Sequence, residues 1–462
     1  MIQNIKQHGN INPWIVTSKK EVVSLITLMT PLLLNGLLHN LVWFFQTFFL
    51  AQLGTDALAA AGLASRFFET VMVFLIGILG AINILVSHKY GASDIPAIRL
   101  VIRDGLLLAL ILIIPVFYII WNISSFFLIL GESPIIVSLS RSYLQSAAWG
   151  IFPIVIMIVV FEALIGFAHT QAVLVFSVIF ISLNLIISYG LIFGKFGLPL
   201  LGISGAGWGM TISYWVTSSL LVFYVINHNS YGYYFRSLFS WQRPFYFKEL
   251  LFIGFSMGTM YCVEVAFFFV LTLAMGSLSI VCLAANQITL QYLGIWRTVA
   301  FSIAQAITAR MGYFLGAGDD ITAKNVAYTG SLIACIFALI VAILYFFFSS
   351  AFISIDLDIN ETNHVEIAIF AKKFLLMSAI FQFFEFIRIS LFGALRALKD
   401  TTFFLVLSIV TFWVIALPYG YLFSNSFSLK GSSFWWGMIL GNLCGVFFLF
   451  LRFKKKLADR AN

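Results

Sequence analysis

The stretch FFEFIRISLFGALRALKDTTFF, residues 383–404, ends one long apolar run at a short turn and opens the next. An apolar run of about 20 residues is what a helix needs to cross the hydrocarbon core of a membrane. Glu385 and Arg388 lie inside the first run, although a charge at the centre of a membrane helix costs about 2.5–3.5 kcal/mol on insertion scales. The stretch therefore predicts a membrane span that keeps charged residues for a function.

The composition extends this interpretation to the whole chain. The 462 residues are 61% hydrophobic and only 10% charged, whereas soluble proteins carry about 25% charged residues. The net charge of +8 comes from short loops and the tail, so it does not indicate nucleic-acid binding. The four cysteines stand singly in apolar segments, which indicates neither a metal site nor a disulfide framework. No phosphate-binding loop, zinc-protease or serine-hydrolase motif occurs, and we expect neither an enzyme nor a bound cofactor.

Twelve apolar segments are long enough to cross a membrane, and polar or Gly/Pro-containing stretches separate them. The predicted fold is an all-α polytopic membrane protein with twelve transmembrane helices. Alternating ten-residue segments, the signature of a membrane β-barrel, do not occur. The predicted spans are residues 22–49, 57–87, 100–124, 142–167, 171–194, 203–227, 250–275, 279–310, 326–353, 369–395, 402–424 and 433–452.

Basic residues predict the orientation, because cytoplasmic loops of membrane proteins carry an excess of Lys and Arg. The tail RFKKK (452–456) is expected in the cytoplasm, and an even number of spans then places Lys19 and Lys20 there too. The acidic loop from Asp356 is expected outside, although two lysines follow it. We expect a multi-pass protein of a bacterial-type inner (plasma) membrane, with both termini cytoplasmic.

The polar stretch at residues 228–249 divides the spans six and six. It predicts an N-terminal lobe (1–227), a cytoplasmic inter-lobe linker and a C-terminal lobe (250–462) that ends in the basic tail. Turns at corresponding places in the two halves have similar sequences. The matching pairs are HKYGASD (88–94) with YFLGAGD (313–319), and GFAHTQAVL (166–174) with ALRALKDTTFF (394–404). Duplicated six-helix halves are typical of transporters, so we expect two pseudo-symmetric lobes around a central cavity.

Ionisable residues within spans are the candidate functional residues. Glu264 has no basic residue near it on its own predicted helix, and at 1.5 Å rise per residue it lies within about one turn of Glu385 in depth. Two such acids could hold one Na⁺ or share a proton. Alternatively, hydrogen bonds between helices could satisfy each carboxylate. Glu162 is predicted to be structural.

Arginines modify this interpretation. Arg388 follows Glu385 by three residues, so the two share a helix face and the pair can neutralise itself. We also consider a switch in which Arg388 competes with a cation for the carboxylate. Arg297 could meet either acid. Arg66 and Glu69 have the same spacing and predict a structural ion pair.

Several motifs, in order and over nearly the whole chain, resemble the multidrug and toxic compound extrusion (MATE) transporters. In the first half, residues 31–64 are similar to the family's opening span and turn. The stretch SLNLIISYGLIFGKFGLPLLGISGAGWGMT (182–211) is similar to its fifth-to-sixth-span signature. In the second half, CLAANQITLQ (282–291) and FGALRALKDT (392–401) resemble the eighth-span pattern and an inner turn.

The resemblance implies an antiporter that exports organic cations and amphipathic drugs against a Na⁺ or H⁺ gradient, from a cavity between two lobes. In the NorM-type branch, two acids of the second lobe hold the coupling cation, and these positions fall on Glu264 and Glu385. Four further residues are candidate modulators of this site: Arg388, Arg297, Asn286 and Gln287. Three are candidate substrate-cavity residues: Gln46, Asn184 and Tyr261. We expect a monomer in the lipid bilayer.

Two departures from the family pattern concern the first lobe. Gln46 stands where an Asp is common, and Ser188 stands where the DinF-type branch has an Asp, so coupling is expected through the second lobe only. A lipid-linked saccharide flippase of the same superfamily is the alternative, since Arg66, Arg297 and Arg388 could hold an anionic cargo. A membrane-embedded enzyme is a further alternative, for which no catalytic cluster is present.

Overall fold

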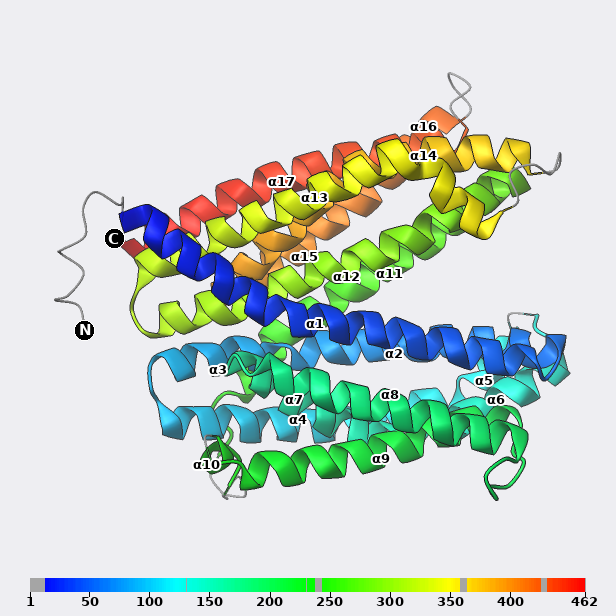
Figure 1. The fold of residues 1–462 in the computed structure, drawn as a ribbon, viewed down its shortest axis with the longest axis horizontal. Coiled ribbons are helices and arrows are strands. Elements are labelled where there is room, and N and C mark those ends of the chain that lie inside the picture. Colours follow the sequence, from blue (N-terminus) through cyan, green and yellow to red (C-terminus); the bar gives the residue numbers. More distant parts are fainter. Residues whose placement is uncertain are drawn as a thin grey trace. The chain divides into compact units, whose positions relative to one another are not determined.

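A computed structural model describes residues 13–129, 131–229, 231–236, 243–357, 364–424 and 430–461, and all regular structure within them is helical (Figure 1). The first half contains α1(Pro13–Ala51), α2(Thr55–Leu79), α3(Ala81–Gly91), α4(Ile95–Asn122), α5(Ser124–Ile129), α6(Pro134–Ala148), α7(Ile151–Gly166), α8(Thr170–Phe193), α9(Ile203–Asn227) and α10(Gly232–Phe235). The second half contains α11(Phe247–Leu278), α12(Ile280–Gly316), α13(Asp320–Asp356), α14(Val365–Ala397), α15(Thr401–Ile409), the π-helix η2(Val410–Ala416), α16(Leu417–Ser424) and α17(Ser432–Ala461).

The helices confirm the predicted fold class. Each of the twelve predicted spans coincides with a described helix or with consecutive helices. By length and apolar composition, 10 helices among the described residues are able to cross a membrane, and the bent pair of α6 and α7 brings the number to 11. The predicted eighth span falls on α12, which carries Arg297 and several polar side chains and is not among them. The number of twelve is therefore compatible with the helices but is not reproduced by this criterion.

Three predicted spans are interrupted. The second is divided at Gly80, between α2 and α3, and the fourth bends by 51° between α6 and α7, where Gly150 precedes α7. The eleventh passes from α15 into the π-helix η2 and then into α16. A glycine lies at each of the first two breaks, whereas the seven residues of η2, VTFWVIA, contain neither Gly nor Pro.

Two compact units account for the contacts of the chain. Unit 1 comprises Met1–Thr30, Thr272–Leu398 and Val414–Asn462, and unit 2 comprises Pro31–Leu271 and Lys399–Trp413. These boundaries differ from those of the two lobes predicted at 1–227 and 250–462, and the lobes stay a prediction. Residues 230 and 237–242 of the predicted linker, and 358–363 of the predicted outer loop, lie outside the described residues.

Small residues let helices of unit 1 approach closely. A Cβ at Gly393 of α14 would lie 2.5 Å from the Ala304 carbonyl oxygen of α12, and Thr308 Oγ1 donates a hydrogen bond to the Gly393 carbonyl at 2.9 Å. Close packing of small residues and hydrogen bonds between helices stabilise helix pairs in membranes. These contacts fix α12 and α14, the two helices that carry Arg297 and Glu385.

The start of α1 belongs to unit 1 and is held there by an ion pair. Glu21 is buried, and its carboxylate accepts hydrogen bonds from Arg310 Nε at 2.9 Å and Nη2 at 3.1 Å. The guanidinium of Arg310 also lies over the ring of Phe314, 4.7 Å from its centroid. Such a two-point pair of Arg and carboxylate fixes geometry as well as charge.

In unit 2, Asp104 of α4 fixes the chain just before α11. Its buried carboxylate accepts two hydrogen bonds from Arg103, at 2.9 and 2.8 Å. Its other oxygen accepts from the backbone N–H groups of Phe245 at 2.8 Å and Tyr246 at 2.7 Å. Further along α11, Gly258 lies so close to Gly77 of α2 that a side chain at Gly77 would clash with its backbone. Both contacts position the helix that carries Glu264.

The four turns paired by the sequence share one backbone geometry. Ser93, Ala168, Gly318 and Lys399 each have a positive φ between 56° and 76°, and the next residue in each case is the N-cap of a helix. Asp94 and Asp319 accept hydrogen bonds from the N–H groups of Ala97 and Thr322, three residues on, as helix N-caps do.

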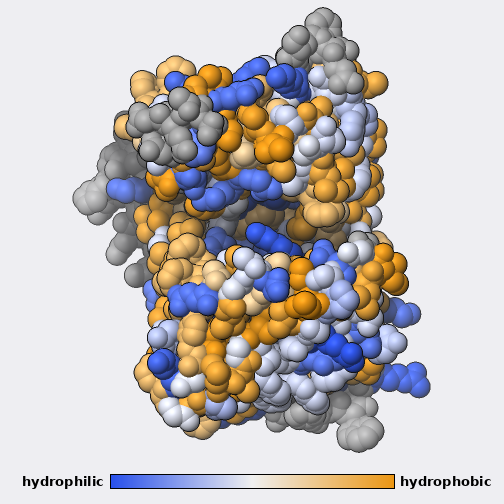
Figure 2. All heavy atoms as spheres, turned by 90° about the vertical axis from the view of Figure 1, so that its right-hand side faces the viewer, coloured by the Kyte–Doolittle hydropathy of each residue, from blue (hydrophilic) through white to orange (hydrophobic). Residues whose placement is uncertain are grey.

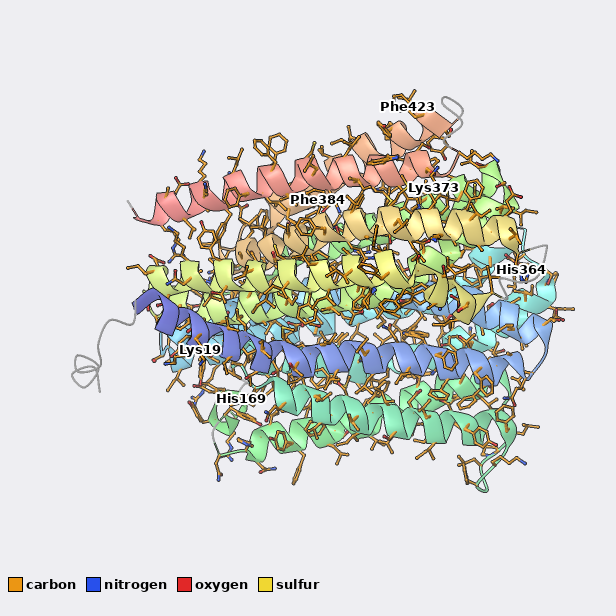
Figure 3. The ribbon with its side chains drawn as sticks, turned by 45° about the horizontal axis from the view of Figure 1, so that its top comes forward. Lys19, His169, His364, Lys373, Phe384 and Phe423 are labelled. Atoms are coloured by element: carbon orange, nitrogen blue, oxygen red, sulfur yellow. The ribbon has the colours of Figure 1, made fainter. Side chains whose placement is uncertain are left out.

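The surface suits a lipid environment. Large apolar side chains such as Ile114, Phe223 and Phe346 are exposed along the spans. Figure 2 shows hydrophobic and hydrophilic residues intermixed over the helix ends in view. Within unit 1, Lys19 lies at one end and His364 and Lys373 lie at the other (Figure 3).

Candidate functional site

Glu385 is bound by the arginine of its own helix. Its side chain is 1% exposed, as is that of Arg388. Arg388 Nε donates to Glu385 Oε2 and Arg388 Nη2 donates to Oε1, both at 2.8 Å. The i, i+3 spacing on α14 therefore produces the self-neutralising pair that the sequence allowed. Phe384, the preceding residue, lies near the middle of α14 (Figure 3).

Two more residues of unit 1 complete the surroundings of this carboxylate. Arg297 of α12 lies 3.6 Å from Oε1, measured from its Nε, so the predicted approach of Arg297 to one of the two acids occurs at Glu385. Asn442 of α17 donates a hydrogen bond from Nδ2 to Oε2 at 2.9 Å. Both carboxylate oxygens thus have positively charged or N–H donors. A metal cation could bind here only after a guanidinium moves away.

Glu264 has a different environment. It lies on α11 in unit 2 and is 1% exposed. Ser408 Oγ, from the last turn of α15, donates a hydrogen bond to Glu264 Oε1 at 3.2 Å. The two predicted coupling acids therefore belong to different compact units, and their sharing of one cation stays a prediction.

Two predicted cavity residues of the first half contact each other. Gln46 of α1 donates from Nε2 to Asn184 Oδ1 of α8 at 3.2 Å, and both side chains are buried. Ser188, one turn further along α8, is also buried, and its hydroxyl makes no hydrogen bond among the described residues. A neutral polar group therefore occupies the place where the resemblance would allow a proton-binding acid.

The remaining predicted residues divide by exposure. Asn286 is buried and its amide makes no hydrogen bond among the described residues, whereas its neighbour Gln287 is exposed. Tyr261 is partly exposed and lies beside Gly77. Glu162 is buried on α7. Arg66 and Glu69 form an exposed ion pair at 3.2 Å, as predicted.

Two functional candidates had not been singled out from the sequence, namely Asn442 and Ser408. Neither is charged, and each lies far along the chain from its acid, by 57 and 144 residues. Their signal in the sequence is weak: each is a polar residue inside an apolar run. A search for uncharged polar residues at mid-span would have found both among many others.

Long apolar helices, an apolar exposed surface and buried ionisable groups define a multi-pass membrane protein of the transporter class. The model of the MatE family matches residues 31–190 and 257–422. The chain belongs to this family, and it is a NorM-type membrane transporter rather than an enzyme. A "Probable multidrug resistance protein NorM" of Pseudomonas putida is 29% identical, over 96% of this chain and 97% of that protein. One of Oceanobacillus iheyensis, with the same description, is 26% identical over 94% and 97%.

Solved structures share the fold. A structure described as "Crystal structure of MATE in complex with MaL6" has a TM-score of 0.86 and 19% identity, covering 97% of this chain and 99% of that chain. A transporter of the MOP superfamily from Pyrococcus furiosus, described as having a binding pocket of reverse polarity, has a TM-score of 0.85 and 18% identity, covering 98% and 100%.

Proposed function

We propose that this transporter exports small organic compounds, cationic and amphipathic drugs among them, in exchange for Na⁺ or H⁺. Relatives described as multidrug resistance proteins support drugs as the substrates. Substrate would move by alternating access of two lobes, in a bacterial inner membrane with both termini in the cytoplasm. We expect a monomer that needs no cofactor besides its coupling ion and binds no nucleic acid.

The observation that carries this proposal is Glu264, a carboxylate buried within a span. A charge in such a place costs several kcal/mol unless it has a function or a partner that compensates. Ser408 Oγ donates a hydrogen bond to this carboxylate at 3.2 Å, which stabilises its charged form. A carboxylate of this kind can take up a cation on one side of the membrane and release it on the other.

In this proposal, Glu385 is the second coupling acid and Arg388 is its competitor. A cation reaches Glu385 when Arg388 leaves, with Arg297, Asn286 and Gln287 as further modulators. Gln46, Asn184 and Tyr261 are proposed to contact substrate in the first half.

The flippase alternative is less well supported than export. The flippase hypothesis required that arginines within the spans be able to bind an anionic cargo. Arg66 pairs with Glu69, and both Arg388 and Arg297 lie against Glu385. The two carboxylates thus compensate two of the three positive charges that such a cargo would need.

Dye efflux in inverted membrane vesicles tests the proposal, with Na⁺ and pH gradients imposed separately. We expect Glu264→Gln to abolish driven efflux while dye binding is retained, because the amide removes the charge and keeps the shape. The gradient that drives the wild-type protein identifies the coupling ion. Glu69→Gln, a change in an exposed pair, is the matched control and should behave as the wild type. Full driven efflux by Glu264→Gln would contradict the proposed role of Glu264.

A further inference from the structure

The last turns of α17 meet the first turns of α13 within unit 1, near the chain end marked C in Figure 1. Arg460 Nε lies 3.4 Å from Asp320 Oδ1. About two turns further along α13, the ring of Tyr328 meets that of Phe453 edge to face, with centroids 6.0 Å apart. Helix α14 packs against both α13 and α17. The two contacts therefore join helices that share a neighbour.

Each of the two helices carries a lysine beside the ring contact. Lys324 lies one turn before Tyr328, and its Nζ is 6.0 Å from the centroid of that ring. Lys454 directly follows Phe453, and its Nζ is 4.5 Å from the centroid of Phe450. Phe453 is 1% exposed, whereas Tyr328 and Phe450 are 40% and 37% exposed. The two lysines and these two rings thus form part of the outer surface.

The chain does not balance the positive charge of these two lysines. Neither ammonium group pairs with a carboxylate among the residues that the structure describes. Asp320, one turn before Lys324, is held by its ion pair with α17, and Asp319 caps the start of α13. Asp459 lies about 240° around α17 from Phe453. An anion at the two lysines would therefore meet little competition from carboxylates.

Apolar side chains continue from both lysines toward the middle of the spans. On α13, Leu332 and Ile336 follow Tyr328 at intervals of four residues, and both are exposed. On α17, Leu451 and Phe447 are exposed in the same way. The surface presents ammonium groups, then aromatic rings, then apolar side chains. A phospholipid presents its phosphate, its ester groups and its acyl chains in the same order.

We propose that Lys324 and Lys454 bind the phosphate of an anionic phospholipid, whose acyl chains lie along α13 and α17. Basic side chains at the ends of membrane helices attract anionic lipids, and basic pockets between such helices bind their headgroups. Aromatic side chains suit the level between headgroup and hydrocarbon. The orientation proposed above places this lipid in the cytoplasmic leaflet. Its binding does not depend on which compound the protein transports.

The test is lipid binding by the purified full-length protein in detergent micelles, counted by native mass spectrometry. Phosphatidylglycerol is titrated against phosphatidylcholine with the same acyl chains. Phosphatidylcholine has the same phosphate but adds a cationic group, which the two lysines repel. We expect the wild type to retain phosphatidylglycerol in preference to phosphatidylcholine.

Variants at the two lysines should remove this preference. Lys324→Gln combined with Lys454→Gln should weaken phosphatidylglycerol binding roughly 25-fold, because each lysine near a membrane surface contributes about fivefold. Lys324→Arg combined with Lys454→Arg keeps both charges and should bind as the wild type does, since guanidinium groups also bind phosphate.

A matched double variant removes the same charge elsewhere in unit 1. Lys455 lies about 200° around α17 from Phe453. Lys20 is exposed at the start of α1, and that helix meets α13 at Gly330, about 240° around α13 from Lys324. Lys20→Gln combined with Lys455→Gln should therefore keep the preference for phosphatidylglycerol.

Three results would overturn the inference. They are equal binding of the two lipids by the wild type, a retained preference in the double glutamine variant at Lys324 and Lys454, and equal losses in that variant and the matched control. Equal losses would show attraction to the overall charge rather than to this surface.

Glycerol phosphate, which has the phosphate ester without acyl chains, separates a lipid site from a site for a free anion. It should not displace phosphatidylglycerol, and displacement at equal concentration would reject the lipid. These measurements involve neither dye export nor the coupling ion. Failure of lipid binding and failure of the proposed function are therefore observed separately.

Discussion

Two of the carboxylates that the chain buries within spans, Glu264 and Glu385, have different surroundings. Glu385 is enclosed by two guanidinium groups and an amide, so its charge is balanced inside the protein. Glu264 receives a hydroxyl from Ser408 beside a π-helix that carries a second buried hydroxyl. The Glu385 carboxylate is thus held by charged partners, whereas the Glu264 carboxylate accepts a hydrogen bond from a neutral hydroxyl. The difference predicts that the two acids respond differently to the same substitution.

The largest expected effect is on stability at Glu385. Glu385→Gln leaves Arg388 buried without its carboxylate, and breaking a buried pair from one side costs about 3–5 kcal/mol. Glu264→Gln should cost about 1 kcal/mol, because its amide oxygen can still accept from Ser408. The free energy of unfolding in mixed detergent micelles measures both.

A double variant checks the reason for that loss. Glu385→Gln combined with Arg388→Met removes both charges and should be more stable than Glu385→Gln alone. Equal losses in the free energy of unfolding for Glu385→Gln and Glu264→Gln would contradict the proposed difference between the two acids.

The next effect concerns Asn442. Asn442→Ala removes a hydrogen bond to the Glu385 carboxylate, and bonds to charged groups contribute roughly 1.5–3 kcal/mol. We expect a loss of about 2 kcal/mol in the same unfolding measurement. Asn227→Ala is the control, because that amide bonds to a carbonyl of its own helix on an exposed face. A loss at Asn442→Ala no larger than that of the control would contradict the importance of this bond.

The smallest expected effect concerns Arg388. Its removal should make Glu385 more similar to Glu264 in cation binding. Arg388→Ala releases Glu385 from its strongest partner, and removing a neighbouring positive charge favours cation binding by about tenfold or more. We expect a higher Na⁺ affinity and an altered pH dependence of efflux. Unchanged affinity and pH dependence would reject the hypothesis that Arg388 competes with the cation.

The helices and the pairing within α14 could be predicted from the sequence because both depend on local spacing. Twenty apolar residues predict a span, and the i, i+3 spacing of Glu385 and Arg388 places them on one face. Ser408 and Asn442 could not be chosen in this way, since nothing local indicates which of many polar residues faces an acid on another helix. The π-helix was also unpredictable, because VTFWVIA lacks the residues that usually interrupt a helix.

The ion pair of Glu21 and Arg310 has a consequence for the order of assembly during synthesis. The two residues are 289 positions apart. At ribosomal speeds of 5–20 residues per second, Glu21 leaves the ribosome roughly 15–60 s before its partner exists. Unit 2 draws most of its residues from the continuous stretch Pro31–Leu271 and can begin to pack in that interval. The start of α1 must wait for that partner before it can take its place in unit 1.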